Sequence, residues 1–303
     1  MKAGFVAIVG QPNVGKSTLF NRVLGEKIAI VSPRPQTTRT RILGVYNGES
    51  TQLAFFDTPG LHRATSELNQ RMVSVALATL SEVDLVLLLV EAGAGPGNRV
   101  EVGESMRWII DEVARRRKET VLGISKMDRV PRESLLPVIA AYKDLHPWSE
   151  VIPFSALTGE NVSELLRALT RLSPESAMRL FPEDTLTDQA ERQIAAEYVR
   201  EQVMLNTRAE VPYSAAVLVE EFDESERNRG KRGLVRIGAT IVVERQGQKG
   251  IMIGKGGALL KEIGTRARGG LEQLLGCKVF LRLNVRVDEH WSDRPQSIRR
   301  LGI

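Results

Sequence analysis

The sequence predicts an α/β domain with a doubly wound, mostly parallel sheet, followed by a smaller α+β domain. The chain has 303 residues, roughly twice a typical domain length of ~150. Up to residue 172, short apolar runs alternate with longer amphipathic segments, and the uninterrupted run 85–90 is typical of a parallel strand covered on both faces. After residue 187 the expected order changes to α-β-β-α-α-β.

The expected elements define a domain division. In the first domain, strands are expected at 3–9, 42–47, 51–57, 83–90, 120–125 and 150–154, and helices at 16–25, 66–81, 98–117, 131–146 and 161–172. In the second, a helix is expected at 188–207, strands at 213–222, 234–245 and 278–287, a long hairpin connection at 223–233, and two short helices within 256–275. The predicted division is 1–172, a proline-containing linker at 173–187, 188–290, and a tail at 291–303.

Composition excludes several classes of protein. With 42% hydrophobic and 26% charged residues, the chain is neither disordered nor collagen-like. The single cysteine, Cys277, excludes an intrachain disulfide and a thiolate zinc cluster, and it indicates a reducing compartment. The longest apolar run is far shorter than the ~20 residues of a membrane span, and the first apolar run leads into a glycine-rich loop instead of a signal cleavage site. We therefore expect a cytoplasmic protein, and we take it to be a monomer.

Positive charge is concentrated late in the chain. The net charge is +5 overall, but residues 227–286 hold 14 basic and only three acidic side chains. Such a block favours a polyanionic partner, and a solvated basic face is the alternative.

Residues 10–17 match the phosphate-loop pattern G-x-x-x-x-G-K-[ST] between an expected strand and an expected helix. The N–H groups of such a loop and the positive end of the helix dipole can surround an anion. Lys16 is predicted to reach the β- and γ-phosphates, and the Ser17 hydroxyl is predicted to ligate Mg²⁺. The predicted nucleotide contacts in this region are Gly10, Asn13, Val14, Gly15, Lys16, Ser17 and Thr18.

Three further segments follow expected strands and bear on which nucleotide binds. Asp57 can hold Mg²⁺ through water, and the Gly60 N–H can sense a γ-phosphate. The carboxylate of Asp128 can accept hydrogen bonds from N1–H and N2–H of guanine, a donor pair that adenine lacks. A backbone N–H of the segment 155–157 would lie near the guanine O6. The predicted contacts to GTP or GDP in these last two segments are Ser125, Lys126, Asp128, Ser155, Ala156 and Leu157.

These motifs, with Gln36-Thr37-Thr38-Arg39 and Asp57-Thr58-Pro59-Gly60-Leu61, resemble the Era-like family of bacterial P-loop GTPases over nearly the whole chain. The resemblance implies hydrolysis of GTP to GDP and phosphate, with Thr38 as an Mg²⁺ ligand only while the γ-phosphate is present. It also implies a K⁺ ion near Asn13. The predicted catalytic residues are Lys16, Thr38, Asp57 and Gly60, and the predicted Mg²⁺ site is Ser17, Thr38 and, through water, Asp57.

Two positions bear on affinity and rate. The family pattern N-K-x-D begins here with Ser125, and serine is too short to make every contact that asparagine makes to the phosphate loop and the base. Leu61 stands where Ras-like proteins have a glutamine that orients the attacking water. We therefore expect weakened guanine affinity and slow intrinsic turnover, helped by a partner, main-chain groups or the K⁺ ion.

A second motif lies in the basic block. Residues 254–257, Gly-Lys-Gly-Gly, match G-x-x-G between an expected extended run and a helix, and with the α-β-β-α-α-β order they resemble a type II KH domain, whose loop clamps a nucleic-acid backbone. The expected ligand is single-stranded RNA, and the family resemblance implies the 3′ end of 16S rRNA during 30S subunit assembly. The predicted RNA contacts are Lys249, Ile251, Ile253, Gly254, Lys255, Gly256, Gly257, Lys261, Arg266 and Arg268, with Ile263 also lining the apolar groove.

Other interpretations remain open on the sequence alone. The chain could be an ATP-using enzyme with an altered base pocket, or a passive RNA-binding protein whose first domain is only a scaffold. The basic block with Arg299 and Arg300 could give a weak peripheral association with the inner membrane, although no amphipathic helix accompanies it. Trp291 could stack on a base or pack in a core, and His62 is expected to be structural or on the surface.

Overall fold

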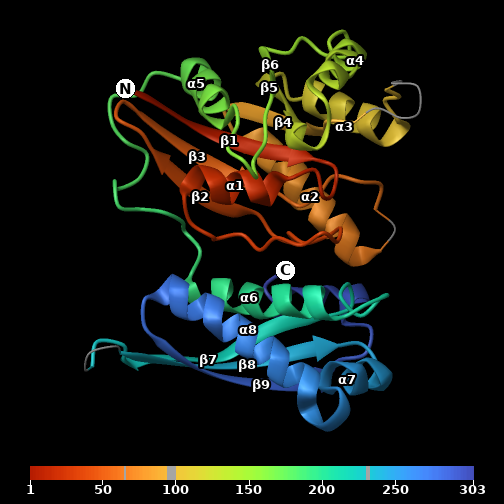
Figure 1. Ribbon diagram of the computed structural model, residues 1–303, viewed down its shortest axis with the longest axis vertical. Coiled ribbons are helices and arrows are strands. Elements are labelled where there is room, and N and C mark those ends of the chain that lie inside the picture. Colours follow the sequence, from red (N-terminus) through yellow and green to blue (C-terminus); the bar gives the residue numbers. More distant parts are fainter. Residues whose placement is uncertain (65, 94–99, 230–232) are drawn as a thin grey trace. The chain divides into compact units, whose positions relative to one another are not determined.

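The computed structural model describes residues 1–303 except 65, 94–99 and 230–232 (Figure 1). Its internal contacts divide the chain into two compact units. The first unit comprises 1–29, 35–65 and 69–188, and the second comprises 30–34, 66–68 and 189–303.

The first unit is built on a six-stranded sheet in the order β2-β3-β1-β4-β5-β6. All neighbouring strands are parallel except β2 with β3. The strands are β1 (Lys2–Gly10), β2 (Ile42–Asn47), β3 (Thr51–Asp57), β4 (Leu85–Glu91), β5 (Glu119–Ser125) and β6 (Glu150–Pro153). The predicted doubly wound, mostly parallel fold is confirmed.

Helices cover both faces of this sheet. They are α1 (Lys16–Leu24), α2 (Glu67–Glu82), α3 (Glu104–Ala114), α4 (Leu135–Tyr142) and α5 (Val162–Leu172). Buried residues of α2, α3 and α4 share one apolar core with Ala7 and Val9 of β1, whereas α1 and α5 pack on the sheet outside that core. The helices predicted at 98–117 and 131–146 are shorter than expected; residues 98 and 99 lie outside the described residues, and a 3-10 turn at Arg132–Ser134 precedes α4.

The strand order explains where a ligand can bind. β1 lies between β3 and β4, so successive connections leave the centre of the sheet in opposite directions. In such a sheet the crevice lies at the carboxyl ends of the strands, at the point where the order reverses. Gly10, Asp57 and Ser125 are the last residues of β1, β3 and β5, and all three therefore lie at this edge.

The second unit is an α+β fold with a three-stranded sheet (Figure 1). The strands are β7 (Ala216–Glu226), β8 (Leu234–Val243) and β9 (Lys278–Val287), with β7–β8 antiparallel and β8–β9 parallel. The helices are α6 (Glu191–Asn206), α7 (Gln246–Ile253), α8 (Ala258–Leu275) and α9 (Pro295–Arg300), and α6 and α8 pack on one face of the sheet. The predicted α-β-β-α-α-β order is confirmed.

Three local predictions in this unit were wrong. Part of the hairpin connection expected at 223–233 is strand, because β7 continues to Glu226. Residues 251–253 are the end of α7 and not an extended run. Gly247 and Gly250 weaken the helical pattern, but the Gln248 side chain accepts hydrogen bonds from the N–H groups of Glu244 and Arg245 and so starts the helix. In addition, α8 is one helix of 18 residues and not two short helices.

Gly270, within α8, serves helix packing. A Cβ atom at Gly270 would lie 2.8 Å from the ring of Tyr198 on α6. Because that distance is too short for carbon–carbon contact, glycine is what allows α6 and α8 to approach this closely.

The last thirteen residues are folded and packed into the second unit. A 3-10 turn at Trp291–Asp293 precedes α9. Trp291 is fully buried, and its Nε1–H donates to the carbonyl oxygen of Ser214 at 2.8 Å. Of the two roles left open for Trp291, the structure therefore shows the packing role.

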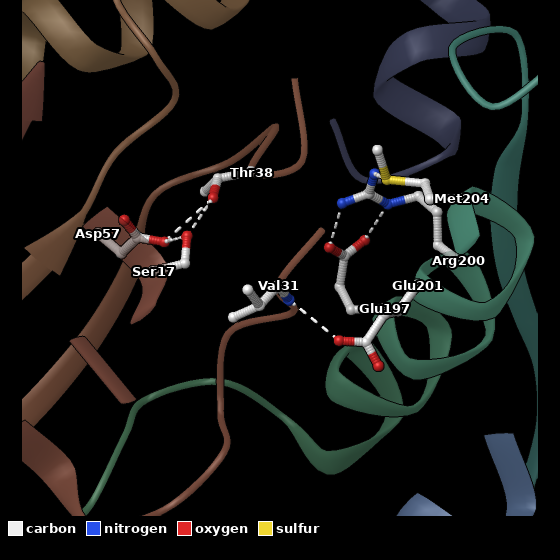
Figure 2. A network of polar contacts seen from close by, with 8 residues as sticks. All are labelled: Ser17, Val31, Thr38, Asp57, Glu197, Arg200, Glu201 and Met204. Atoms are coloured by element: carbon white, nitrogen blue, oxygen red, sulfur yellow. Dashed lines mark hydrogen bonds and ion pairs between the residues drawn. The ribbon is translucent and has the colours of Figure 1, made fainter. Parts of the chain in front are cut away.

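The segment 30–34 also belongs to the second unit. The Val31 N–H donates to Oε1 of Glu201 on α6 at 3.0 Å, as Figure 2 shows, and the Arg34 guanidinium donates to the carbonyl oxygen of Thr207 just after α6. Within α6, the buried Arg200 is paired with Glu197. None of the helices in the described part of the chain has the length and apolar character of a membrane span.

Candidate nucleotide site and nucleic-acid interface

The loop between β1 and α1 is positioned by a close approach to β4. Gly10 has φ 148°, and a Cβ atom there would lie 2.6 Å from the carbonyl oxygen of Leu89, so only glycine fits where the loop begins. At the other end of the loop, the Leu19 N–H donates to the carbonyl oxygen of Gly15 at 2.9 Å and closes the first turn of α1. The N–H groups of a helix N-terminus therefore face the loop, which is the arrangement that binds phosphate.

Lys16 is a buried cation inside this loop. Its side chain is folded back so that Nζ donates to the carbonyl oxygens of Gln11 at 2.9 Å and of Gly10 at 3.3 Å. Burial lowers the pKa of Lys16 to about 8, and the charge of Asp57 opposes that shift. A buried ammonium whose hydrogen-bond acceptors are neutral carbonyls favours an anion beside it, because attraction to the anion offsets the solvation free energy lost on burial.

Three oxygen side chains converge next to Lys16. Ser17 Oγ donates to Oδ2 of Asp57 at 2.7 Å, Thr38 Oγ1 donates to the same atom at 3.1 Å, and the two hydroxyl oxygens lie 2.9 Å apart (Figure 2). Burial raises the pKa of Asp57, while the hydrogen bonds from Ser17 and Thr38 and the charge of Lys16 lower it. The structure thus brings together the three residues that were predicted to bind Mg²⁺, Ser17 and Asp57 from their motifs and Thr38 from the family resemblance.

This cluster fits a magnesium ion. Within the described part of the chain, Oδ1 of Asp57 is buried and has no hydrogen-bond partner, so one carboxylate oxygen is left for an ion or its water. Mg²⁺ prefers oxygen ligands and is usually held by one or two protein groups plus water and substrate phosphates. Among the described residues no group of three or more His, Cys, Asp or Glu side chains could hold a metal by itself, and the one-carboxylate site agrees with that preference.

The turn after β3 passes directly over the phosphate loop. A Cβ atom at Gly60 would lie 2.8 Å from the backbone nitrogen of Pro12, and the Leu61 N–H donates to the carbonyl oxygen of Gly10 at 3.0 Å. The Leu61 side chain is fully buried in the core and is turned away from solvent. It therefore cannot orient a water molecule. His62 Nδ1 lies 2.9 Å from the Gly60 carbonyl oxygen, a structural contact within the turn.

Ser125 reaches the phosphate loop despite its length. Its buried Oγ lies 2.6 Å from the carbonyl oxygen of Val14 and 3.0 Å from that of Val90. The expected loss of contact with the phosphate loop is therefore limited, and any deficit relative to asparagine concerns the base. Lys126 Nζ is paired with Glu91 at 2.7 Å, and Asp128 lies exposed in the 3-10 turn Met127–Arg129.

The segment 155–157 and the phosphate-loop helix line one hollow. Its volume is about 360 Å³, and its walls include Thr18 and Arg22 of α1 together with Ala156 and Leu157. Two predicted nucleotide-binding segments, far apart in the sequence, thus meet at the same edge of the sheet. Arg22, which contacts the 155–157 segment, was not singled out from the sequence because it lies outside every recognisable motif; only the contact itself identifies it.

The G-x-x-G motif forms a tight connection between α7 and α8. Lys255 is exposed in the 3-10 turn Lys255–Gly257, and a Cβ atom at Gly256 or Gly257 would meet nothing within 4 Å. The backbone of this connection is therefore open to a ligand. Ile251 is 51% exposed, but Ile263 is fully buried. The prediction that Ile263 lines a groove was wrong, since on α8 it faces the core.

Ion pairs divide the basic block into two parts. Arg236, Arg282 and Arg286 of the sheet are paired with Glu226, Glu221 and Glu220, which lie outside the block. Around the G-x-x-G connection the cations are less neutralised: within the described residues only Arg266 of the predicted RNA contacts forms an ion pair, with Glu262. The predicted contacts without one are Lys249, Lys255, Lys261 and Arg268.

Comparisons with known proteins match both units of the chain. A family model described as a 50S ribosome-binding GTPase matches residues 5–126, and a KH domain model matches residues 210–292. The chain is 50% identical to a GTPase Era of Geobacter metallireducens and 49% identical to that of Geotalea daltonii, in each case over 99% of this chain and 97% of the relative.

Two solved structures resemble the whole chain with a TM-score of 0.91. One is a crystal structure of Era in complex with MgGDPNP and nucleotides 1506–1542 of 16S ribosomal RNA, at 41% identity. The other is a variant of Aquifex aeolicus Era bound to GDP and AlF4⁻, at 40% identity. Each match covers 100% of this chain and 99% of the solved chain.

Fold and site together define a P-loop GTPase joined to a KH domain. The first unit carries the phosphate loop and the oxygen cluster, and the second carries the G-x-x-G connection. The chain belongs to the GTPase Era family, and its activity is the hydrolysis of GTP.

Proposed function

We propose that this GTPase binds GTP and GDP through residues 10–18, 125–128 and 155–157, and single-stranded RNA at the 3′ end of 16S rRNA through its G-x-x-G connection, during 30S subunit assembly. Nucleotide binding is supported by the hydrogen-bonded cluster of Ser17, Thr38 and Asp57 beside the buried Lys16. The RNA half is supported by the similar Era whose structure contains nucleotides 1506–1542 of 16S rRNA. The proposal includes the division into a nucleotide domain (1–172), a linker (173–187), an RNA domain (188–290) and a tail.

In the proposed reaction, water attacks the γ-phosphate in line with the leaving GDP. The Lys16 ammonium and the N–H groups of the phosphate loop and of Gly60 stabilise the negative charge that spreads over the phosphate oxygens. Ser17, Thr38 and, through a water molecule, Asp57 would hold a Mg²⁺ ion, which would supply positive charge to the triphosphate. Because the Leu61 side chain is buried in the core, no side chain at this position orients the water, and we expect slow intrinsic turnover.

We propose that a K⁺ ion near Asn13 supplies part of the missing stabilisation. Replacing K⁺ by Na⁺ at constant ionic strength is then expected to lower kcat about tenfold, the effect of losing ~1.4 kcal/mol of transition-state stabilisation. The affinity for GDP, measured in the same buffers, serves as the control and should change little. Equal turnover in the two salts would remove K⁺ from the mechanism.

Charge reversal at Lys255 tests the RNA interface. Lys255→Glu is expected to weaken binding of an RNA oligonucleotide copied from the 3′ end of 16S rRNA by at least about tenfold, because a phosphate contact becomes a repulsion. The slope of log affinity against log salt should fall by about one for the lost contact. Fluorescence anisotropy at several salt concentrations measures both quantities.

The matched control is Lys143→Glu, which reverses the charge of an exposed lysine in the first unit. It should leave RNA affinity and salt slope unchanged. An equal loss in both variants would mean that only net charge matters, and the proposed interface would then be wrong.

We further propose that the bound nucleotide changes RNA affinity. Thr38 belongs to the oxygen cluster that the γ-phosphate and Mg²⁺ would complete, and ordering of such a segment is a common GTPase switch. The preceding residues 30–34 group with the second unit, where Val31 is hydrogen-bonded to α6. Thr38 therefore follows closely in the chain after a segment that is hydrogen-bonded to α6, and the backbone between them connects the oxygen cluster to the second unit.

Two minor parts of the proposal concern oligomeric state and membrane association. We propose a cytoplasmic monomer. A weak peripheral association with the inner membrane has less support than RNA binding, because Arg300, one of the two basic residues that suggested it, is paired with Asp288.

A further inference from the structure

Arg22 connects the phosphate-loop helix to the loop at 155–157. It lies in the last turn of α1, where its Nε donates to the carbonyl oxygen of Ala156 at 2.9 Å and its Nη2 donates to that of Leu157. Within the described residues the Arg22 guanidinium donates to these two carbonyls and forms no ion pair. Charge-assisted hydrogen bonds of this kind are stronger than neutral ones.

The contact determines which way a peptide group points. In a trans peptide the C=O and the following N–H point in opposite directions. When Arg22 holds the Ala156 carbonyl towards α1, the Leu157 N–H must therefore point away from α1. In the described part of the chain, no backbone acceptor receives the N–H of Ala156 or of Leu157. Both donors remain for a ligand, and hydrogen bonding at the carbonyl polarises the peptide and strengthens its N–H as a donor.

The loop does not need Arg22 to close. The Ser155 N–H donates to the Glu160 carbonyl oxygen at 3.0 Å, the Gly159 N–H donates to the Ser155 carbonyl oxygen at 2.9 Å, and the Thr158 N–H donates to Ser155 Oγ at 3.1 Å. These bonds fix the loop's own shape. Arg22 instead sets the position of the loop against α1, the helix that begins at the phosphate loop.

We propose that Arg22 is a positioning residue for guanine recognition, holding the 155–157 loop so that its free N–H donors meet the guanine O6. This inference rests on the proposed function, in which the loop at 155–157 contacts the base. It assigns a role to a residue outside the nucleotide motifs and links the phosphate-binding and base-binding ends of the site through one side chain.

The test compares three nucleotides that differ at the base. Guanosine diphosphate and inosine diphosphate both carry O6, whereas the diphosphate of 2-aminopurine riboside lacks it. For Arg22→Ala, the affinities for the first two nucleotides should fall about tenfold, the effect expected from losing about one charge-assisted hydrogen bond. The affinity for the 2-aminopurine nucleotide should change less than about twofold, because its base has no O6 for the loop to bind.

Two further variants separate positioning from a structural role. Arg22→Lys keeps the positive charge at the C-terminal end of α1 but loses the two-pronged guanidinium, so we expect only partial recovery of GDP affinity; full recovery would indicate a helix-dipole effect and overturn the inference. Arg167→Ala removes an exposed arginine of α5 that is paired with Glu164, and it should leave all three affinities unchanged.

The test distinguishes failure of the Arg22 inference from failure of the proposed guanine recognition. If Arg22→Ala weakens all three nucleotides equally, or weakens none of them, Arg22 does not act through O6 and the inference is wrong. If the unsubstituted protein binds the 2-aminopurine nucleotide as tightly as GDP, the proposed guanine recognition fails, and the inference fails with it. Thermal unfolding of each variant confirms that affinity is measured on folded protein.

Discussion

Replacing Lys16 by alanine is expected to lower kcat/KM for GTP by about 10³-fold, because a preorganised positive charge at the transferring phosphate is lost. The Lys16 ammonium is buried among carbonyl oxygens beside Asp57, so no other described cation is placed to substitute for it without rearrangement. The rate of phosphate release, measured against GTP concentration at saturating Mg²⁺, gives the effect. The same variant should bind GDP more weakly.

The Lys16→Ala substitution should lower activity without lowering stability. Burial lowers the pKa of Lys16 and so disfavours its charged form in the folded protein, and we expect removal of the side chain to leave the thermal midpoint nearly unchanged. Arg167→Ala, an exposed change in the same unit, is the matched control and should hydrolyse GTP normally. Unchanged turnover in Lys16→Ala, or full support of growth by that variant, would favour the passive-scaffold interpretation.

Changing Asp128 to asparagine is expected to lower GDP affinity by about 100-fold and to allow binding of xanthosine diphosphate. The Asp128 carboxylate is expected to accept hydrogen bonds from N1–H and N2–H of guanine, and asparagine, whose amide presents a donor, loses one of them. Asp128 is exposed in a short turn after β5, so the substitution should leave the fold intact. Xanthine has an oxygen where guanine has its 2-amino group, and the asparagine NH₂ can donate to that oxygen.

Competition against a labelled guanine nucleotide measures this change. GTP, but not ATP at equal concentration, should displace the label from the unsubstituted protein. Xanthosine diphosphate should displace it from Asp128→Asn. Displacement of the label by ATP from the unsubstituted protein would support the ATP-using interpretation instead. Asp144→Asn, at another exposed aspartate of the same unit, should have no effect on base preference.

Much of the fold could be predicted because local and global signals agree in the first unit. The bounds of β2 and β3 were predicted as they occur, and Gly10, Asp57 and Ser125 were placed at strand ends, where a parallel sheet binds ligands. The meeting of Thr38 with Ser17 and Asp57, by contrast, came from family resemblance, since no local pattern links these positions.

The failures arise where a specific side-chain contact decides the structure. Residues 251–253 were expected to be extended, yet they end a helix that the Gln248 side chain caps. Residues 256–275 were expected to form two short helices, yet α8 is one helix whose Gly270 approaches Tyr198. The charge of the block at 227–286 was counted along the chain, whereas its neutralising glutamates come from β7. Contacts such as that of Arg22 are invisible to sequence patterns for the same reason.

The most direct test of the account measures RNA affinity in two nucleotide states. The RNA oligonucleotide from the 3′ end of 16S rRNA is titrated into the protein at fixed salt, once with Mg²⁺-GDP and once with a Mg²⁺-bound non-hydrolysable GTP analogue. Since Thr38 is expected to join the metal only in the second state, the two dissociation constants should differ by more than about fivefold, a typical lower bound for coupled sites. Identical constants, together with GTP turnover that RNA leaves unchanged, would contradict the proposal that one site governs the other.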